Sequence, residues 1–117
     1  MSELQGIARF KFDEGGLEEF KRLSAQCVEI VQTKDTGTLQ YEIYLSDDES
    51  EAIVCERYRD SEALIEHSVN LGDIEAAILA TGSVSGELLG EPSAHLRANL
   101  ANAPVRVFSL YLSMRHG

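Results

Sequence analysis

The sequence has few of the residues that build metal centres, disulfide frameworks or nucleotide-binding loops. Its two cysteines, Cys27 and Cys55, have neither CxxC spacing nor a histidine at ligand spacing. The three histidines are too widely spaced to form a metal site. No GxGxxG pattern, P-loop or serine nucleophile elbow occurs. We therefore expect two reduced core thiols, with a disulfide as the alternative, and no metal or nucleotide site.

Positive charge is also scarce. Lysine and arginine number 10 against 20 acidic residues, which gives a formal net charge of −10. Nucleic acids and anionic membranes repel such a surface, so neither is an expected partner. No stretch approaches the ~20 apolar residues of a membrane span. The first four residues carry no basic region or apolar run typical of a signal peptide. A cytoplasmic protein without membrane association is therefore predicted.

The composition that remains is ordinary for a globular domain. Apolar residues make up 44% of the 117 residues and charged residues 26%. This length suits a single core, so we expect one domain over residues 1–117.

The spacing of the apolar residues predicts the element order β-α-β-β-α-β-α-β. Alternation favours strands, and three- and four-residue steps favour helices, one of which is divided at Gly72. The middle of this order is the split βαβ pattern, which predicts an α+β, ferredoxin-like fold with an antiparallel sheet. The expected strands cover residues 7–12, 39–45, 53–58, 84–89 and 105–112, and the expected helices residues 17–34 and 61–80 and a short segment after Ser93.

The last expected strand, residues 105–112, is apolar on both faces. Phe108, Leu110 and Leu112 share one face, and Val105 and Tyr111 lie on the other. In this fold the helices cover one face of the sheet only, so something must cover the second face. A second copy of the same sheet would do so, which predicts a homodimer.

Two segments resemble the antibiotic biosynthesis monooxygenase family. The run from Tyr41 to Tyr44, and that from Glu56 to His67, match its signature of a strand ending in Glu-x-aromatic, a short acidic or serine cap, and a helix with Ala-Leu and a histidine. The segment from Gly86 to Arg97 is similar to one branch of the family. The element order matches over most of the chain.

The resemblance implies a dimeric α/β barrel with an apolar pocket between sheet and helices. It also implies chemistry without a flavin or metal, in which the anion of an electron-rich aromatic substrate passes an electron to O₂. The aromatic after Glu-x is often tryptophan in this family, whereas this chain has Tyr58 and no tryptophan. Haem-degrading members use a histidine later in the helix, and residues 69–73 contain none, which argues against haem chemistry.

Four residues are the candidates for the site. His67 lies on the apolar stripe of its helix and is the candidate proton acceptor or hydrogen-bond donor; the alternative is a core histidine satisfied by a neighbour. Asn70 is a candidate ligand-orienting residue or a helix cap. Tyr58 and Glu56 share a strand face and are candidates to line the pocket, or else form a core aromatic beside an ion pair.

These observations support two main hypotheses of function. The first is a cofactor-independent monooxygenase acting on a quinol-like or polyphenolic aromatic molecule. The second is a non-catalytic small-molecule-binding or stress-response protein on the same dimeric scaffold. Both expect a small apolar or aromatic ligand, and a haem-binding protein is a third alternative.

Overall fold

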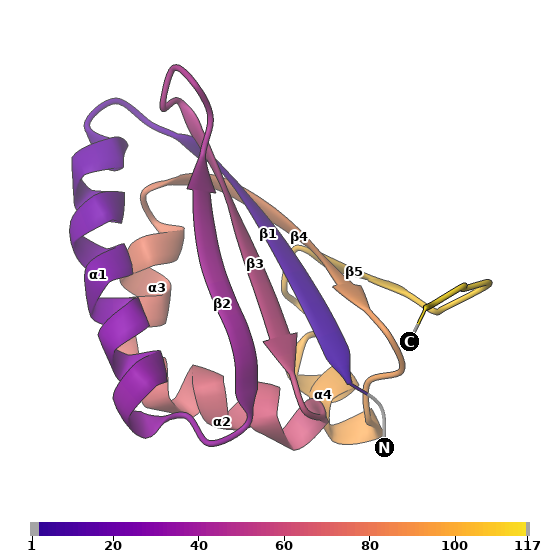
Figure 1. The fold of residues 1–117 in the computed structure, drawn as a ribbon. Coiled ribbons are helices and arrows are strands. Elements are labelled where there is room, and N and C mark those ends of the chain that lie inside the picture. The colour runs from indigo at the N-terminus through magenta and orange to yellow at the C-terminus, as the bar shows by residue number, and fades with distance from the viewer. Residues whose placement is uncertain (1–2, 117) are drawn as a thin grey trace.

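The computed structural model describes residues 3–116. It confirms the predicted element order, including the division of the second long helix at Gly72, and the α+β ferredoxin-like fold (Figure 1). The elements are β1 (Leu4–Phe12), α1 (Gly16–Lys34), β2 (Thr38–Leu45), β3 (Glu51–Tyr58), α2 (Ser61–Leu71), α3 (Asp73–Leu79), β4 (Gly82–Leu89), α4 (Ala94–Asn99) and β5 (Val105–Phe108).

The five strands form one sheet in the order β2-β3-β1-β4-β5. Neighbouring strands are antiparallel from β2 to β4, whereas β5 runs parallel to β4. The parallel pair arises because the connection between them passes through α4, and a crossover of this kind brings the chain back in the same direction. The expected antiparallel sheet is therefore mostly antiparallel, with one parallel edge.

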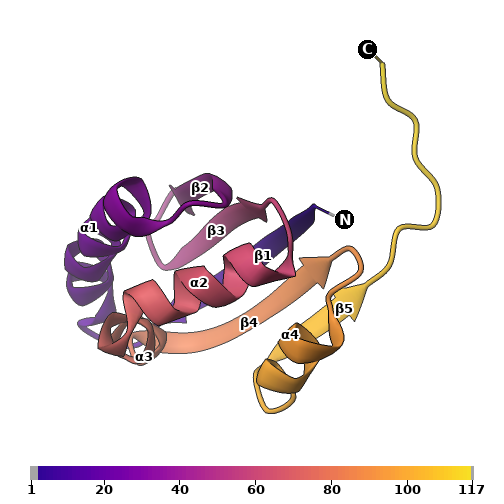
Figure 2. The same ribbon diagram turned by 90° about the horizontal axis from the view of Figure 1, so that it is seen from below.

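The helices lie on one face of the sheet, and side chains alternate between that face and the outer one (Figures 1 and 2). In β1, Leu4 and Phe10 point inward and are buried, whereas Gln5 and Arg9 point outward and are exposed. The buried residues form two hydrophobic clusters. The larger contains Phe10, Phe20, Leu23, Cys27, Ala52, Val54, Leu71 and Ile78, and the smaller contains Leu4, Leu88 and Leu96.

Local hydrogen bonds fix the ends of the helices over the sheet. The Asp60 side chain accepts from the Ala63 amide at 2.9 Å, and Ser93 accepts in the same way at the start of α4. Gly72 separates α2 from α3 with φ of 54°, in the left-handed region that favours glycine. The chain therefore turns at Gly72, and α3 packs against α1.

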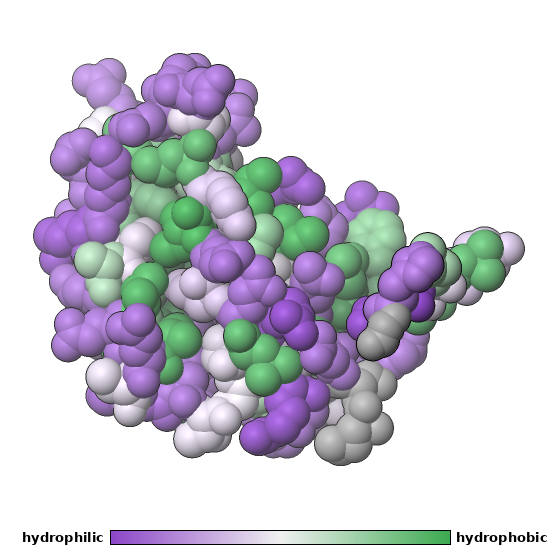
Figure 3. Space-filling model, viewed as in Figure 1, coloured by the Kyte–Doolittle hydropathy of each residue, from purple (hydrophilic) through white to green (hydrophobic). Residues whose placement is uncertain are grey.

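The C-terminal segment differs from expectation. The last strand was predicted to reach residue 112, but β5 ends at Phe108, where its neighbour β4 also ends at Leu89. With no strand beside it, the chain after β5 runs away from the body as an extended arm (Figure 2). Its large apolar side chains are mostly exposed, including Leu110 at 73% and Tyr111 at 89%. Hydrophobic side chains on this arm and over the strands are visible in Figure 3.

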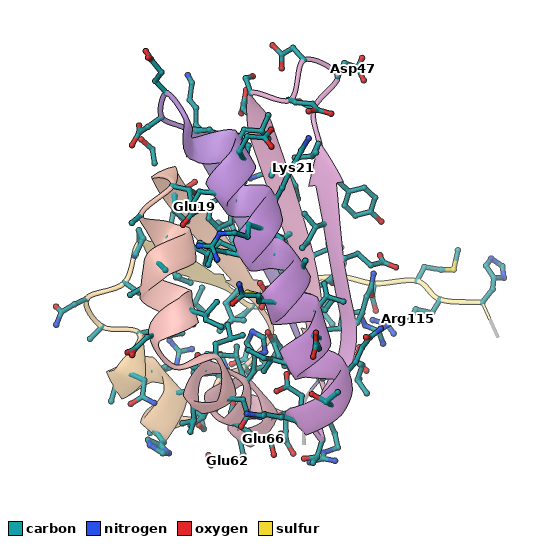
Figure 4. The ribbon with its side chains drawn as sticks, turned by 90° about the vertical axis from the view of Figure 1, so that its left-hand side faces the viewer. Glu19, Lys21, Asp47, Glu62, Glu66 and Arg115 are labelled. Atoms are coloured by element: carbon teal, nitrogen blue, oxygen red, sulfur yellow. The ribbon has the colours of Figure 1, made fainter. Side chains whose placement is uncertain are left out.

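The helical layer presents charged side chains to solvent. Figure 4 shows Glu19 and Glu62 projecting away from the helices, whereas Glu66 accepts hydrogen bonds from Thr36. Glu19 pairs with Arg22 at 2.6 Å across one helical turn. Among the helices of residues 3–116, none is long and apolar enough to cross a lipid bilayer.

Candidate functional site

A cavity of about 370 Å³ lies between the sheet and helices α2, α3 and α4. This volume is within the range of pockets that bind small molecules. Most of its lining is apolar and includes residues packed against each of the two hydrophobic clusters. The lining residues are Ala8, Glu56, Leu64, Ile65, Ser68, Glu75, Leu79, Val84, Ser85, Gly86, Leu96, Asn99, Leu100, Ala103, Pro104 and Val105.

Glu56 brings a carboxyl group to this cavity from the inner face of β3. Alternation along the strand places Val54, Glu56 and Tyr58 on the same side. The Tyr58 hydroxyl donates a hydrogen bond to Glu56 Oε1. Burial raises the pKa of Glu56 above its usual value, and the charges of Glu75 and Asp35 add to this effect; the hydrogen bond from Tyr58 and the nearby His67 oppose it.

His67 lies behind Tyr58, in the α2 layer, and is 4% exposed. Its Nδ1 is 2.8 Å from Asp35 Oδ2. The imidazole ring packs against two tyrosine rings, with centroid distances of 5.4 Å to Tyr41 and 5.5 Å to Tyr58. His67 is thus held by one carboxylate and two aromatic rings, and it does not belong to the lining of the cavity that Glu56 faces.

Asp35 is the centre of the polar cluster around His67. Asn70 Nδ2 donates to Asp35 Oδ1 at 2.8 Å, and Thr38 Oγ1 donates to Oδ2 at 2.7 Å. Burial by itself would raise the pKa of Asp35, but the hydrogen bonds from Asn70, Thr38 and His67 together lower it. Asp35 is therefore held as a carboxylate where α1 passes into β2.

The match to known proteins is to one family. The model of the antibiotic biosynthesis monooxygenase family matches residues 6–78, which run from within β1 to the end of α3 but for its last residue. The chain belongs to the antibiotic biosynthesis monooxygenase family. The resemblance seen in the sequence is thereby confirmed. No curated protein sequence matches the chain closely enough to count as a relative.

Solved structures of similar proteins share the fold of this family member. MupZ from Pseudomonas fluorescens superimposes with a TM-score of 0.85 at 24% identity, over 99% of this chain and 96% of MupZ. Rv0793 from Mycobacterium tuberculosis gives 0.68 at 24% identity, over 79% and 97% of the two chains. SnoaB from Streptomyces nogalater, a cofactor-independent oxygenase, gives 0.66 at 15% identity, over 80% and 97%.

The four candidate residues occupy one continuous region of this family member. Glu56 and Tyr58 are hydrogen-bonded, Tyr58 packs on His67, and both His67 and Asn70 bond to Asp35. Glu56 alone of the four lines the cavity. The roles predicted for His67, Tyr58 and Asn70 stay predictions, and the geometry gives each of them a bonding partner within the protein.

Two residues of this region were not identified from the sequence. They are Asp35, which follows the end of α1 directly, and Glu75, which lies in the first turn of α3. Only the fold shows that this end of α1 lies close to α2, the helix that carries His67. Among residues 3–116, no group of three or more His, Cys, Asp or Glu side chains is placed to hold a metal ion.

The two cysteines are both free. Cys27 is fully buried in the larger cluster, and burial raises the pKa of its thiol. Cys55 differs from the expectation of a core thiol, because its side chain lies half-buried on the outer face of β3, away from the helices.

Proposed function

We propose that this protein is a cofactor-independent monooxygenase that acts on a quinol-like or polyphenolic aromatic molecule bound in the cavity under α2 and α4. The observation that carries the proposal is the carboxyl of Glu56 in an otherwise mostly apolar cavity. Family membership supports oxygenase chemistry, and the fold is shared with the cofactor-independent oxygenase SnoaB.

Glu56 begins the proposed reaction by taking the proton of a substrate hydroxyl. A carboxyl whose pKa is raised is a stronger base than an exposed glutamate, and this suits proton abstraction from a phenol. The resulting phenolate passes electrons to O₂, and a C–O bond forms at a free ring carbon. That carbon loses its hydrogen as the O–O bond breaks. One oxygen atom stays as a quinone carbonyl and the other leaves as water, so O₂ accepts the four electrons that the substrate loses.

Tyr58, His67 and Asn70 support this reaction as positioning residues. The Tyr58 hydroxyl fixes one oxygen of Glu56 and leaves the other free for the substrate. The His67 ring packs on Tyr58, and its own orientation is held by Asp35. Asn70 holds the second oxygen of Asp35. The mostly apolar lining of the cavity also limits the water that could reprotonate the phenolate.

The test is oxygen uptake with a panel of naphthols, anthrones and quinols, comparing the wild type with Glu56→Gln. Loss of a general base should lower turnover by ~10²-fold or more. Glu29→Gln, the same substitution at an exposed position of α1, should turn over as the wild type does. Equal turnover by Glu56→Gln would refute the role of Glu56.

A non-catalytic binding protein on the same scaffold is the second candidate. The mostly apolar lining favours it, because such a lining can hold an aromatic ligand without reacting with it. Recovery of ligand after incubation in air separates the two functions. A bound but chemically unchanged ligand, with no oxygen consumed, would favour the binding protein.

We also propose that the protein is a homodimer in which the outer faces of two sheets meet and each C-terminal arm packs on the other copy. The arm leaves Leu112 78% and Met114 73% exposed, and the edge strand β2 leaves Tyr44 55% exposed. Water-exposed apolar side chains of this size and number favour a partner surface. A second copy carries the complementary sheet face by symmetry.

Light scattering tests the dimer, which should have about twice the chain mass of 12.9 kDa. Leu112→Asp should weaken the dimer, because a carboxylate would then be buried at the interface without a partner. Val69→Asp is the matched control, since Val69 is 73% exposed on α2, distant in sequence from the arm. A wild-type monomer at micromolar concentration would refute the proposal.

The finer expectation of a cytoplasmic location also stays a proposal. It is supported by the two free cysteines, because thiols persist in the reducing cytosol. Fractionation of cells that express the chain would test it, and recovery of the chain outside the cytosolic fraction would contradict it.

A further inference from the structure

A second carboxylate faces the cavity and has no part in the proposed reaction. Glu75 lies in α3, one turn after the bend at Gly72, and lines the same cavity as Glu56. Ser68 Oγ, in the last turns of α2, donates to Glu75 Oε2 at 3.2 Å. This bond spans the bend between α2 and α3, so the helix break and the serine together hold the Glu75 side chain in place.

The charged side chains that the structure places in the cavity lining are acidic. The lining contains Glu56 and Glu75, and among the lining residues that the structure describes there is no lysine, arginine or histidine. Glu75 also acts on Glu56, because the charge of Glu75 contributes to the raised pKa of Glu56. An anionic group entering this space would lose its hydration and meet negative charge, both of which disfavour binding.

The polar groups of the cavity also limit the kind of hydrogen bond that a ligand makes. An ionised carboxylate accepts hydrogen bonds and donates none. Ser68 already donates to one oxygen of Glu75, which leaves the other oxygen available. A ligand that satisfies Glu75 must therefore present a hydroxyl or N–H group, in addition to the group that meets Glu56.

We propose that Glu75 is a specificity-determining residue, which accepts a hydrogen bond from a hydroxyl or N–H of the ligand and excludes ligands that carry a negative charge. The inference rests on the proposed function in one respect, that the cavity is the ligand site. It adds the residue that selects among aromatic ligands, and it requires no oxygen chemistry.

The experiment uses three naphthalenes that share a hydroxyl at one end and differ at the other. The second group is a hydroxyl, a carboxamide or a carboxylate, and the last two have nearly the same shape but differ in charge. Binding to the full-length protein is measured by the intrinsic fluorescence of the probe, without oxygen. The wild type should bind the carboxamide and the diol at least ~10-fold more tightly than the carboxylate.

Glu75→Gln removes the charge and keeps the shape of the side chain. In this variant the affinity difference between carboxamide and carboxylate should shrink several-fold, whereas the Glu29→Gln control should keep the wild-type difference. Ser68→Ala gives a second test through the residue that holds Glu75, and should also reduce the difference. The melting temperature of each variant establishes that it is folded.

Three results would overturn the inference. The first is equal affinity of the wild type for the carboxylate and the carboxamide, and the second is an affinity difference between these two probes that stays unchanged in folded Glu75→Gln. The third is a wild type that does not bind the diol. Selective binding without oxygen uptake would instead refute the monooxygenase and leave the role of Glu75 standing, so the two proposals fail separately.

Discussion

Replacing His67 by alanine should cost folding stability and leave most of the cavity chemistry in place. The side chains of His67 and Asp35 are 5% and 1% exposed, with Nδ1 and Oδ2 2.8 Å apart. Loss of a hydrogen bond to a charged group costs ~1.5–3 kcal/mol, and loss of the ring contacts to Tyr41 and Tyr58 costs ~0.5–1.5 kcal/mol. The free energy of unfolding should fall by roughly 2–4.5 kcal/mol.

Thermal unfolding followed by circular dichroism measures this loss, and we expect the melting temperature to fall by ~10 °C or more. Oxygen uptake per folded molecule should fall by less than ~10-fold, because a positioning residue is lost and the base, Glu56, remains. His67→Gln keeps an N–H donor for Asp35, so it should recover part of the stability. This second variant keeps the test usable if His67→Ala does not fold.

The opposite pattern would rule out a purely structural role for His67. A His67→Ala variant that melts with the wild type yet turns over ~10²-fold more slowly would identify His67 as the base. Glu56→Gln is the reference in the same assays, since it should lose turnover and keep its fold. The pair of variants therefore separates a structural histidine from a catalytic one.

Three further predictions concern charge and thiols. The folded-state pKa of Glu56 is raised, so protonated Glu56 supports folding below the usual value of 4.5, and this support is lost as pH rises through the raised value. In urea unfolding, Glu56→Gln should therefore be more stable than the wild type at neutral pH and no more stable than the wild type in acid. The pKa of Asp35 shifts in the opposite direction, so the Asp35 carboxylate supports folding above 3.8, and this support is lost as pH falls through the lowered value. Asp35→Asn should therefore be less stable than the wild type at neutral pH, and the difference in stability should narrow in acid. Cys27 should react slowly with a thiol reagent until the protein unfolds, and fast labelling of Cys27 in the native state would contradict its buried position. Cys55 should react faster when dilution separates the proposed dimer.

Most of the fold was predictable because its signals are local. The alternation in β1 and the three- and four-residue steps of α1 each lie within one element, and the caps Asp60 and Ser93 stand next to the helices that they begin. The end of β5 was not predictable in this way. Alternation continues to residue 112, but a strand needs a neighbour, and β4 already ends at Leu89.

The site was predictable only in part, for a similar reason. Alternation within β3 places Glu56 and Tyr58 on one face, so their proximity follows from the sequence alone. The contact between Asp35 and His67 joins residues 32 positions apart. Nothing in the local pattern distinguishes Asp35 from the other acids of this chain, and Glu75 faces the cavity only because the bend at Gly72 turns α3.

The different environments of two carboxyls favour Glu56 over Asp35 as the general base of the proposed reaction. Asp35 accepts hydrogen bonds from Asn70, Thr38 and His67, and its pKa is lowered, so it holds its charge and binds a proton weakly. Glu56 accepts from Tyr58 in a cavity whose other acid adds negative charge, and its pKa is raised. A general base must bind a proton readily and stand beside the substrate. Asp35 instead holds His67 in place behind Tyr58, so the reaction that we propose begins at Glu56.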